Sequence, residues 1–217
     1  RLQRAQEYFD RSQSLLEKLP DTRLKAFSRL IRGRLWQKRG DINQAQSEFQ
    51  ASVELARSRN LLEEELAGCL DLLFLKLERE NPAETEESLR QAEMLIQKGE
   101  FSHLAPLLDL AHALYWQKKG DKNQALQFVM SGLEAVAVQQ NPEPILKISL
   151  WAGRLWKQSN DYQQAYYAWQ KGAIAFSRAY KSIKLPELKQ SYQTENYRQE
   201  LVREFKEMAR LLSGSRV

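Results

Sequence analysis

Residues 33–52 read GRLWQKRGDINQAQSEFQAS, and residues 153–172 read GRLWKQSNDYQQAYYAWQKG. A third segment at 113–132, ALYWQKKGDKNQALQFVMSG, follows the same pattern. The three segments begin at positions 33, 113 and 153, so they share a period of 40 residues, and a weaker copy begins at 73. Self-similarity at a fixed period without gaps predicts an architecture of stacked repeats.

Small and large residues occupy fixed columns of this repeat. Small residues let helix backbones approach closely, and large residues fill the space beside them. Gly33 and Gly153 fall inside expected helices, where glycine costs about 1 kcal/mol relative to alanine, so we expect close packing to offset that cost. The main columns are Ala5, Ala45, Ala125 and Ala165; Phe9, Phe49, Leu89, Val129 and Trp169; Ser12, Ser52, Ala92, Gly132 and Gly172; and Gly33, Leu73, Ala113 and Gly153.

Each repeat reads as two helices joined by a tight turn. Apolar residues recur at helical spacing on both sides of Gly40-Asp41. Glycine supplies the left-handed backbone that ends a helix, and the aspartate can cap the next helix. Gly120-Asp121 and Asn160-Asp161 repeat this turn, with asparagine in the place of glycine.

The order of Gly33, Trp36, Gly40-Asp41, Ala45 and Phe49 resembles the tetratricopeptide repeat. The resemblance covers the chain through about residue 180 and implies an all-α, right-handed superhelical solenoid of antiparallel helix pairs. The repeat here is longer than the common form, so it is more similar to the long repeats of kinesin light chains or of the sensor domain of the bacterial maltose-regulon activator. The unit at 62–98 departs from the pattern, because Leu73 and Lys76 replace the small residue and the aromatic.

We expect one continuous array over residues 1–217. Its apolar segment Leu66–Leu77 is hydrophobic on nearly every side, so we expect that helix to be buried on more than one face. Beyond residue 186 the stripe Tyr197, Leu201, Phe205, Met208 and Leu212 predicts a capping helix, or alternatively a surface that packs on another domain. The expected segments are 1–19 (the second helix of a truncated unit of a longer protein), the helix pairs 22–58, 62–98, 103–139 and 143–180, and a C-terminal helix at 186–213.

The composition contains few of the residue patterns that carry chemistry. No phosphate-binding glycine loop, nucleophile elbow or metal-ligand spacing occurs, and His103 and His112 do not share a helix face. The single cysteine, Cys69, is interpreted as a buried apolar residue. We therefore expect no enzyme activity, no cofactor, no metal and no catalytic residue. The lone cysteine favours a cytoplasmic setting, and the resemblance to the maltose-regulon activator implies a bacterial regulatory protein.

The resemblance implies a concave groove lined by the first helix of each unit. We predict a leucine track with a basic and polar edge there, suited to a peptide or protein segment of acidic and apolar character. The alternative for Leu30, Leu110 and Leu150 is that they are core residues covered by the adjacent unit. The predicted partner-binding residues are Leu30, Arg34, Gln37, Lys38, Leu110, Leu114, Gln117, Lys118, Leu150, Arg154 and Lys157.

Two other functions fit the same sequence. The net charge of +5 raises the possibility of a basic surface for nucleic acid, although 33 basic residues are mixed with 28 acidic ones. The chain could also associate with a second copy through Leu66–Leu77 or through the C-terminal stripe. A binding or sensor domain without catalytic activity remains the favoured interpretation.

Overall fold

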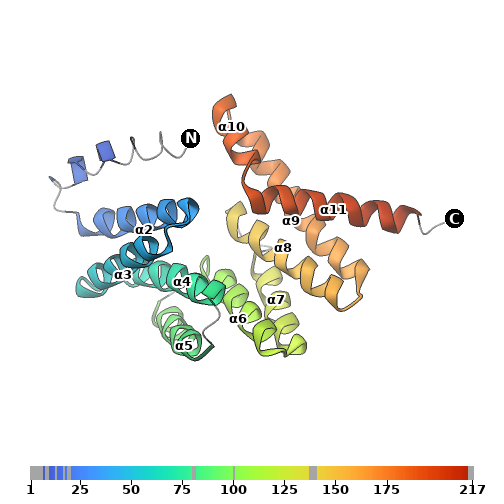
Figure 1. Ribbon diagram of the computed structural model, residues 1–217, viewed down its shortest axis with the longest axis horizontal. Coiled ribbons are helices and arrows are strands. Elements are labelled where there is room, and N and C mark those ends of the chain that lie inside the picture. The colour runs from blue at the N-terminus through green and yellow to red at the C-terminus, as the bar shows by residue number, and fades with distance from the viewer. Residues whose placement is uncertain are drawn as a thin grey trace. The chain divides into compact units, whose positions relative to one another are not determined.

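The computed structural model is all-helical (Figure 1). It describes residues 21–79, 82–99, 101–136 and 141–214, together with residues 7, 10–12, 14–16 and 18, and no strand occurs among these residues. The helix expected at 1–19 lies largely outside the described residues. The helices are α2 (Thr22–Arg39), α3 (Ile42–Ser58), α4 (Leu62–Arg79), α5 (Pro82–Lys98), α6 (Ala105–Lys119), α7 (Lys122–Ala135), α8 (Pro142–Gln158), α9 (Tyr162–Ser182), α10 (Pro186–Gln193) and α11 (Asn196–Gly214).

The turns lie where the repeat predicts them. Gly40 and Gly120 both have φ 84°, and Asn160 has φ 59°, so each takes the left-handed conformation after a helix. The following aspartates cap α3, α7 and α9, since their side chains accept hydrogen bonds from the backbone N–H three residues on, at 3.0–3.1 Å. Asn81, the corresponding position of the divergent unit, lies outside the described residues.

Close packing explains the glycines inside α2 and α8. A Cβ on Gly33 would lie 2.4 Å from Phe49 Cε1, and one on Gly153 would lie 2.2 Å from the Trp169 ring. Both rings are fully buried, so each aromatic residue lies against the backbone of the preceding helix. The column of Gly33 and Gly153 therefore contacts the aromatic column of the second helix in the same pair, whereas Gly132 and Gly172 of the other small column lie against Ile148 and Leu201 of the helices that follow.

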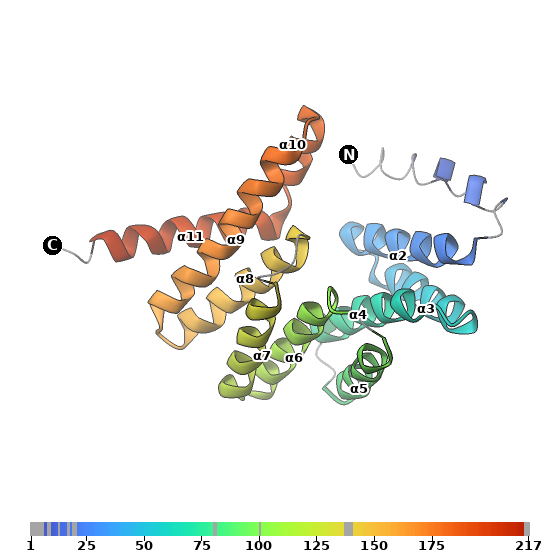
Figure 2. The ribbon, with the colours of Figure 1, turned by 180° about the vertical axis from the view of Figure 1, so that it is seen from behind.

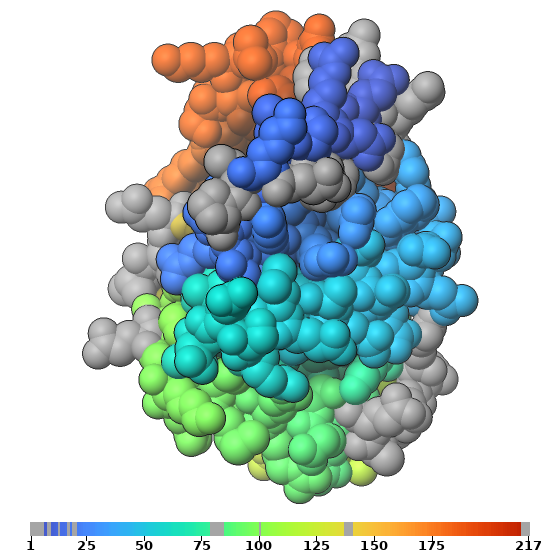
Figure 3. All heavy atoms as spheres, turned by 90° about the vertical axis from the view of Figure 1, so that its left-hand side faces the viewer, coloured from blue at the N-terminus to red at the C-terminus, as the bar shows by residue number. Residues whose placement is uncertain are grey.

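The chain divides into two compact units, residues 1–101 and 102–217. In the first unit α2 packs on α3, and α4 packs on α2, α3 and α5. Figure 3 faces this unit and shows the blue and cyan atoms of α2 and α3 in continuous contact. Its core joins Leu30, Ala45, Phe49 and Leu75.

Helix α4 is buried on opposite sides, as its all-round apolar character predicts. Leu66, Leu70, Leu73 and Leu77 form one buried stripe at helical spacing, and Leu75 is buried on the other side of the helix. Lys76, which stands where other units carry tryptophan, donates a 2.8 Å hydrogen bond from Nζ to Ser88 Oγ of α5. The divergent unit is thus a packed helix pair despite its altered columns.

In the second unit α8 and α9 pack on each other and on α11, as both ribbon views show (Figures 1 and 2). The C-terminal stripe contributes Leu201 and Met208 to a buried cluster around Trp169, with Tyr197, Phe205 and Leu212 packed against it. The stripe is therefore covered by the helices of its own unit. This contact places α11 on the last helix pair, where a capping helix was expected.

The segment expected as one helix at 186–213 is two helices. The Thr194 hydroxyl lies 3.0 and 3.1 Å from the backbone carbonyl oxygens of Gln190 and Ser191 and shares its one hydrogen with them, and α10 ends there. The carbonyl of Glu195 then accepts the first hydrogen bonds of α11, from Arg198 N and Gln199 N. A threonine side chain that competes for backbone hydrogen bonds accounts for this break.

Candidate partner-binding surface

The predicted partner-binding residues lie on α2, α6 and α8, the helices that carry the small column and the tryptophan column. We call this set the first-helix face. Its members on α2 belong to the first unit, and its members on α6 and α8 belong to the second. The structure describes each part on its own.

Three members of the predicted leucine track are buried. Leu30, Leu110 and Leu150 expose 1–2% of their surface, because each packs inside its own unit. They are core residues, as the alternative interpretation held. The prediction of an exposed leucine track is therefore wrong, and the exposed residues of this set are mainly polar. Leu114 is half-buried, and the other predicted residues keep some exposure to solvent.

In the first unit the polar residues of α2 reach toward α4. Arg34 Nε donates to Asp71 Oδ2 at 2.9 Å, and Gln37 Nε2 contacts Glu78 Oε1 at 3.5 Å. Lys38 follows at the exposed end of α2. Each contact joins residues about one repeat apart, so it links the first helix of one pair to the first helix of the next.

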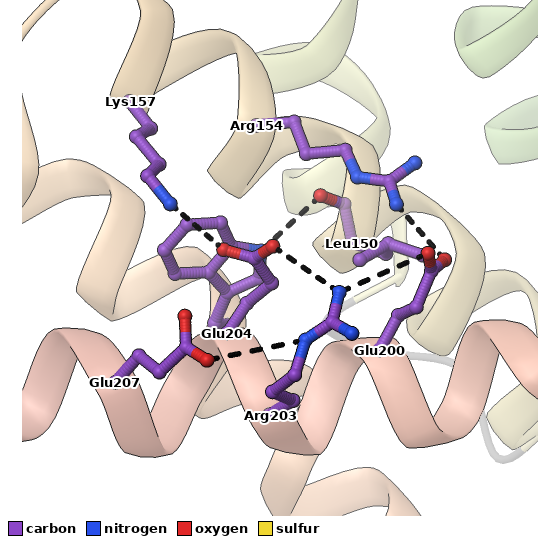
Figure 4. Close-up of polar contacts among 8 residues, drawn as sticks. Leu150, Arg154, Lys157, Glu200, Arg203, Glu204 and Glu207 are labelled. Atoms are coloured by element: carbon purple, nitrogen blue, oxygen red, sulfur yellow. Dashed lines mark hydrogen bonds and ion pairs between the residues drawn. The ribbon is translucent and has the colours of Figure 1, made fainter.

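The second unit repeats these links. Gln117 Nε2 of α6 donates to Gln158 Oε1 of α8 at 3.1 Å. One pair further on, α11 takes the position of the next first helix. There Arg154 Nη2 donates to Glu200 Oε2 at 2.9 Å, and Lys157 Nζ donates to Glu204 Oε2 at 3.0 Å (Figure 4).

Aromatic rings hold these cations in place. The guanidinium of Arg154 lies 4.9 Å from the centroid of the Trp151 ring, and Lys157 Nζ lies 5.7 Å from that of Trp169. A cation over an aromatic face gains about 0.5–2 kcal/mol, depending on its exposure. Both cations are therefore fixed from two sides, by a carboxylate and by a ring.

The paired arginines keep donors for another molecule. In the contacts above, Arg34 donates from Nε and Arg154 donates from Nη2. A guanidinium has five N–H donors, so each arginine has others that these ion pairs do not use. The Arg34 side chain is 45% exposed and that of Arg154 is 27% exposed. A carboxylate from a partner can thus bind the remaining donors without breaking the internal pairs.

Sequence reasoning missed the acidic half of this surface. Asp71, Glu78, Glu200 and Glu204 were not predicted, although each lies 37–47 residues after the residue that it contacts. The available signal was an acidic residue about one repeat after a basic residue or, for Glu78, after a glutamine. It is a weak signal, because charged residues are frequent throughout the chain.

The histidines and the described acidic residues do not form a metal site. Within the described ranges no three His, Cys, Asp or Glu side chains gather as ligands. His112 is buried and stacks on Phe128, with 4.4 Å between the ring centroids. None of the described helices has the length and hydropathy of a membrane-spanning segment.

Cys69 is buried, as its position in the apolar helix predicts. Burial raises the pKa of its thiol from 9.0 to about 11. Between these two values the unfolded thiol ionises while the folded one keeps its proton. The contribution of Cys69 to the free energy of unfolding is therefore complete below about pH 9 and falls as the pH rises toward 11.

We expect the Cys69 thiol of the native protein to react with Ellman's reagent about 100-fold more slowly than in the unfolded chain at the same mildly alkaline pH. The shift of about two pKa units alone lowers the thiolate fraction by that factor, and burial slows access further. Absorbance of the released thiolate, with and without concentrated guanidinium chloride, measures both rates. Equal rates would contradict the burial of this side chain.

Comparison with known proteins gives a structural likeness only. No protein-family model matches the sequence, and no curated protein matches it. The structure matches 32 chains of solved structures. One is the crystal structure of BtubC (BKLC) from P. vanneervenii, with a TM-score of 0.58 and 12% identity over 85% of this chain and 77% of that chain.

The chain has a helical-repeat-like fold. At 12% identity the likeness to BtubC (BKLC) shows the fold alone. The function of this helical-repeat protein therefore has to be argued from its own residues.

Proposed function

We propose that this protein is a tetratricopeptide-like array, a right-handed solenoid of antiparallel helix pairs, that binds a protein segment on its first-helix face and catalyses no reaction. Three observations support the architecture: the 40-residue columns, the capped turns at Gly40, Gly120 and Asn160, and the likeness to a helical-repeat structure. The similarity of these long repeats to a bacterial sensor domain supports a cytoplasmic regulatory setting.

The proposal rests on one observation: in each unit, cations on the first helices pair with carboxylates of the same unit. Arg34, Arg154 and Lys157 are each held by a carboxylate of the next first helix while part of the side chain stays exposed. A side chain that is already ordered loses little conformational entropy when a partner binds it. Such a surface suits carboxylates presented at regular intervals by a protein segment.

The acidic residues that pair with these cations favour a protein partner over nucleic acid. Asp71 lies beside Arg34 in the first unit, and Glu200 and Glu204 lie beside Arg154 and Lys157 in the second. Phosphates that contact these cations would therefore also meet negative charge. A protein segment can instead place its own basic or apolar residues opposite these carboxylates. The nucleic-acid alternative therefore predicts a steep dependence of affinity on salt that we do not expect.

We expect replacement of Arg34, Lys118 and Arg154 by glutamine to weaken binding of a protein segment by about tenfold or more, because three charge-assisted contacts are lost together. Peptides are first selected on the wild-type chain from a random library of displayed peptides, then measured by fluorescence anisotropy. Circular dichroism of each variant reports whether the helices are retained.

The matched control replaces Lys122, Lys171 and Lys181 by glutamine, which removes the same charge from exposed positions on α7 and α9. Its affinity should stay within about twofold of the wild type, as expected for distant surface charges. Equal losses in the two triple variants would mean that net charge alone drives binding. Unchanged affinity of every selected peptide for the first variant would exclude the first-helix face.

A further inference from the structure

A hollow of about 380 Å³ lies between α9, α10 and α11 of the second unit. Seven of its nine lining residues come from α11, and α9 and α10 contribute one residue each. The predicted partner-binding residues do not line it. Its lining residues are Phe176, Gln193, Arg198, Gln199, Val202, Arg203, Lys206, Glu207 and Arg210.

Positive charge is in excess around this hollow. Arg203, Lys206 and Arg210 recur at i, i+3 and i+7 of α11, so they share one face of that helix. Lys206 and Arg210 form no ion pair with the described residues, and Arg203 lies 3.8–4.0 Å from three glutamates, beyond hydrogen-bond distance (Figure 4). Glu207 is the single acidic residue of the lining.

The apolar part of the lining is held rigidly. The Phe176 ring stacks on Tyr192 with 5.6 Å between centroids and on Tyr180 with 5.9 Å. Val202 lies on α11 beside the aliphatic stems of the long cationic side chains, which offer additional apolar surface. The hollow therefore offers a fixed aromatic contact next to exposed positive charges.

Arg198 ties the hollow to the core of the unit. Its guanidinium pairs with Glu143 of α8 and donates to the backbone carbonyl oxygen of Tyr192 at 2.9 Å. It also lies 3.7 Å from the centroid of the Tyr192 ring. These contacts join α8, α10 and α11, so the walls of the hollow are formed before any ligand arrives.

We propose that this hollow is a second docking site, which binds a protein segment that presents a carboxylate next to an apolar side chain. The carboxylate pairs with Lys206 and Arg210, and the apolar side chain packs on Phe176 and Val202. Charge complementarity selects an acidic partner, since Lys206 and Arg210 form no ion pair within the described part of the chain and can both bind one carboxylate. The site lies outside the first-helix face and does not depend on the function proposed for it.

The size and surroundings of the hollow favour a peptide over nucleic acid. A volume of about 380 Å³ has room for one or two side chains, whereas a nucleic acid presents a long series of phosphates. Glu200, Glu204 and Glu207 lie along the same helix and would repel such a series. A short segment with a single acidic and apolar pair avoids that repulsion.

The test uses three fluorescein-labelled peptide pools, each about ten residues long. The first alternates Asp or Glu with Leu or Phe, the second replaces the acids by Asn or Gln, and the third replaces the apolar residues by Ser. We expect the full chain to bind the first pool at least about tenfold more tightly than either of the others, because both halves of the hollow must be filled. Equal binding of the first two pools would overturn the proposal.

A double variant assigns the binding to the hollow. Lys206→Gln with Arg210→Gln should weaken binding of the first pool by about tenfold, whereas Lys171→Gln with Lys181→Gln on α9 should change it by less than about twofold. Unchanged binding by the first double variant, with retained helicity, would exclude this site. Displacement of the peptides by a single-stranded oligonucleotide would show a nucleic-acid surface instead.

The same measurement on the triple variant of the first-helix face separates the two proposals. Loss of peptide binding in that variant alone supports the first-helix face and overturns the hollow as the site. Loss of binding only in the variant with Lys206→Gln and Arg210→Gln supports the hollow as the docking site. It would also mean that the first-helix face does not bind the acidic and apolar peptides.

Discussion

Replacement of Trp169 by alanine is expected to lower the free energy of unfolding by about 3–5 kcal/mol. The indole is fully buried in the cluster that joins α8, α9 and α11. It contacts the backbone at Gly153, and its Nε1 donates to the carbonyl oxygen of Leu150 at 3.2 Å. Because the cavity would lie between three helices, neighbouring side chains can fill only part of it.

Urea unfolding followed by circular dichroism measures this loss as a lower midpoint concentration. Tyr167→Ala, at a residue on the same helix that is 47% exposed, is the matched control and should change stability by less than about 1 kcal/mol. A similar loss in both variants would contradict the central position of Trp169. If only the transition of the second unit moves, the two compact units unfold separately.

Gly33→Ala is expected to destabilise the protein by about 1–3 kcal/mol, opposite in sign to the usual effect of this change in a helix. In an open helix, alanine is about 1 kcal/mol more favourable than glycine. At Gly33, however, the new methyl group would lie 2.4 Å from Cε1 of the buried Phe49 ring. The ring or the helix must move, and the tightly packed core resists both movements.

A double-mutant cycle with Phe49→Leu tests the cause. Phe49→Leu alone also lowers the free energy of unfolding. The double variant should lose about 1 kcal/mol less than the sum of the two single losses, because the smaller side chain removes the clash. Urea midpoints of the four proteins provide the comparison. Additive losses, or a stabilised Gly33→Ala protein, would show that Phe49 does not lie against this backbone.

The sequence predicted the fold best where the local structure depends on residues that are adjacent along the chain. The left-handed conformations of Gly40, Gly120 and Asn160 follow from residue type, and so do the aspartate caps after them. The helix break at Thr194, which the pattern missed, depends on a hydrogen bond from a side chain that helices also tolerate. Apolar spacing continues across that position, so periodicity alone does not reveal the break.

The candidate sites were harder to predict from the sequence. Helical spacing predicted that Arg34, Arg154 and Lys157 lie on the first helices, but the carboxylates that hold them come from α4 and α11, further along the chain. Spacing also did not separate buried leucines from exposed ones, since Leu150 is covered by residues from other helices. The hollow beside α11 was not predicted at all.

The sequence by itself determined the helices, their turns and the pairing of small with large residues, because each depends on backbone preference or on the spacing of side chains within one repeat. Only the tertiary structure decided which cations are paired, which leucines are covered and where a hollow remains. Those features depend on atoms that approach from helices about 20 to 50 residues away, and their positions follow from packing as a whole.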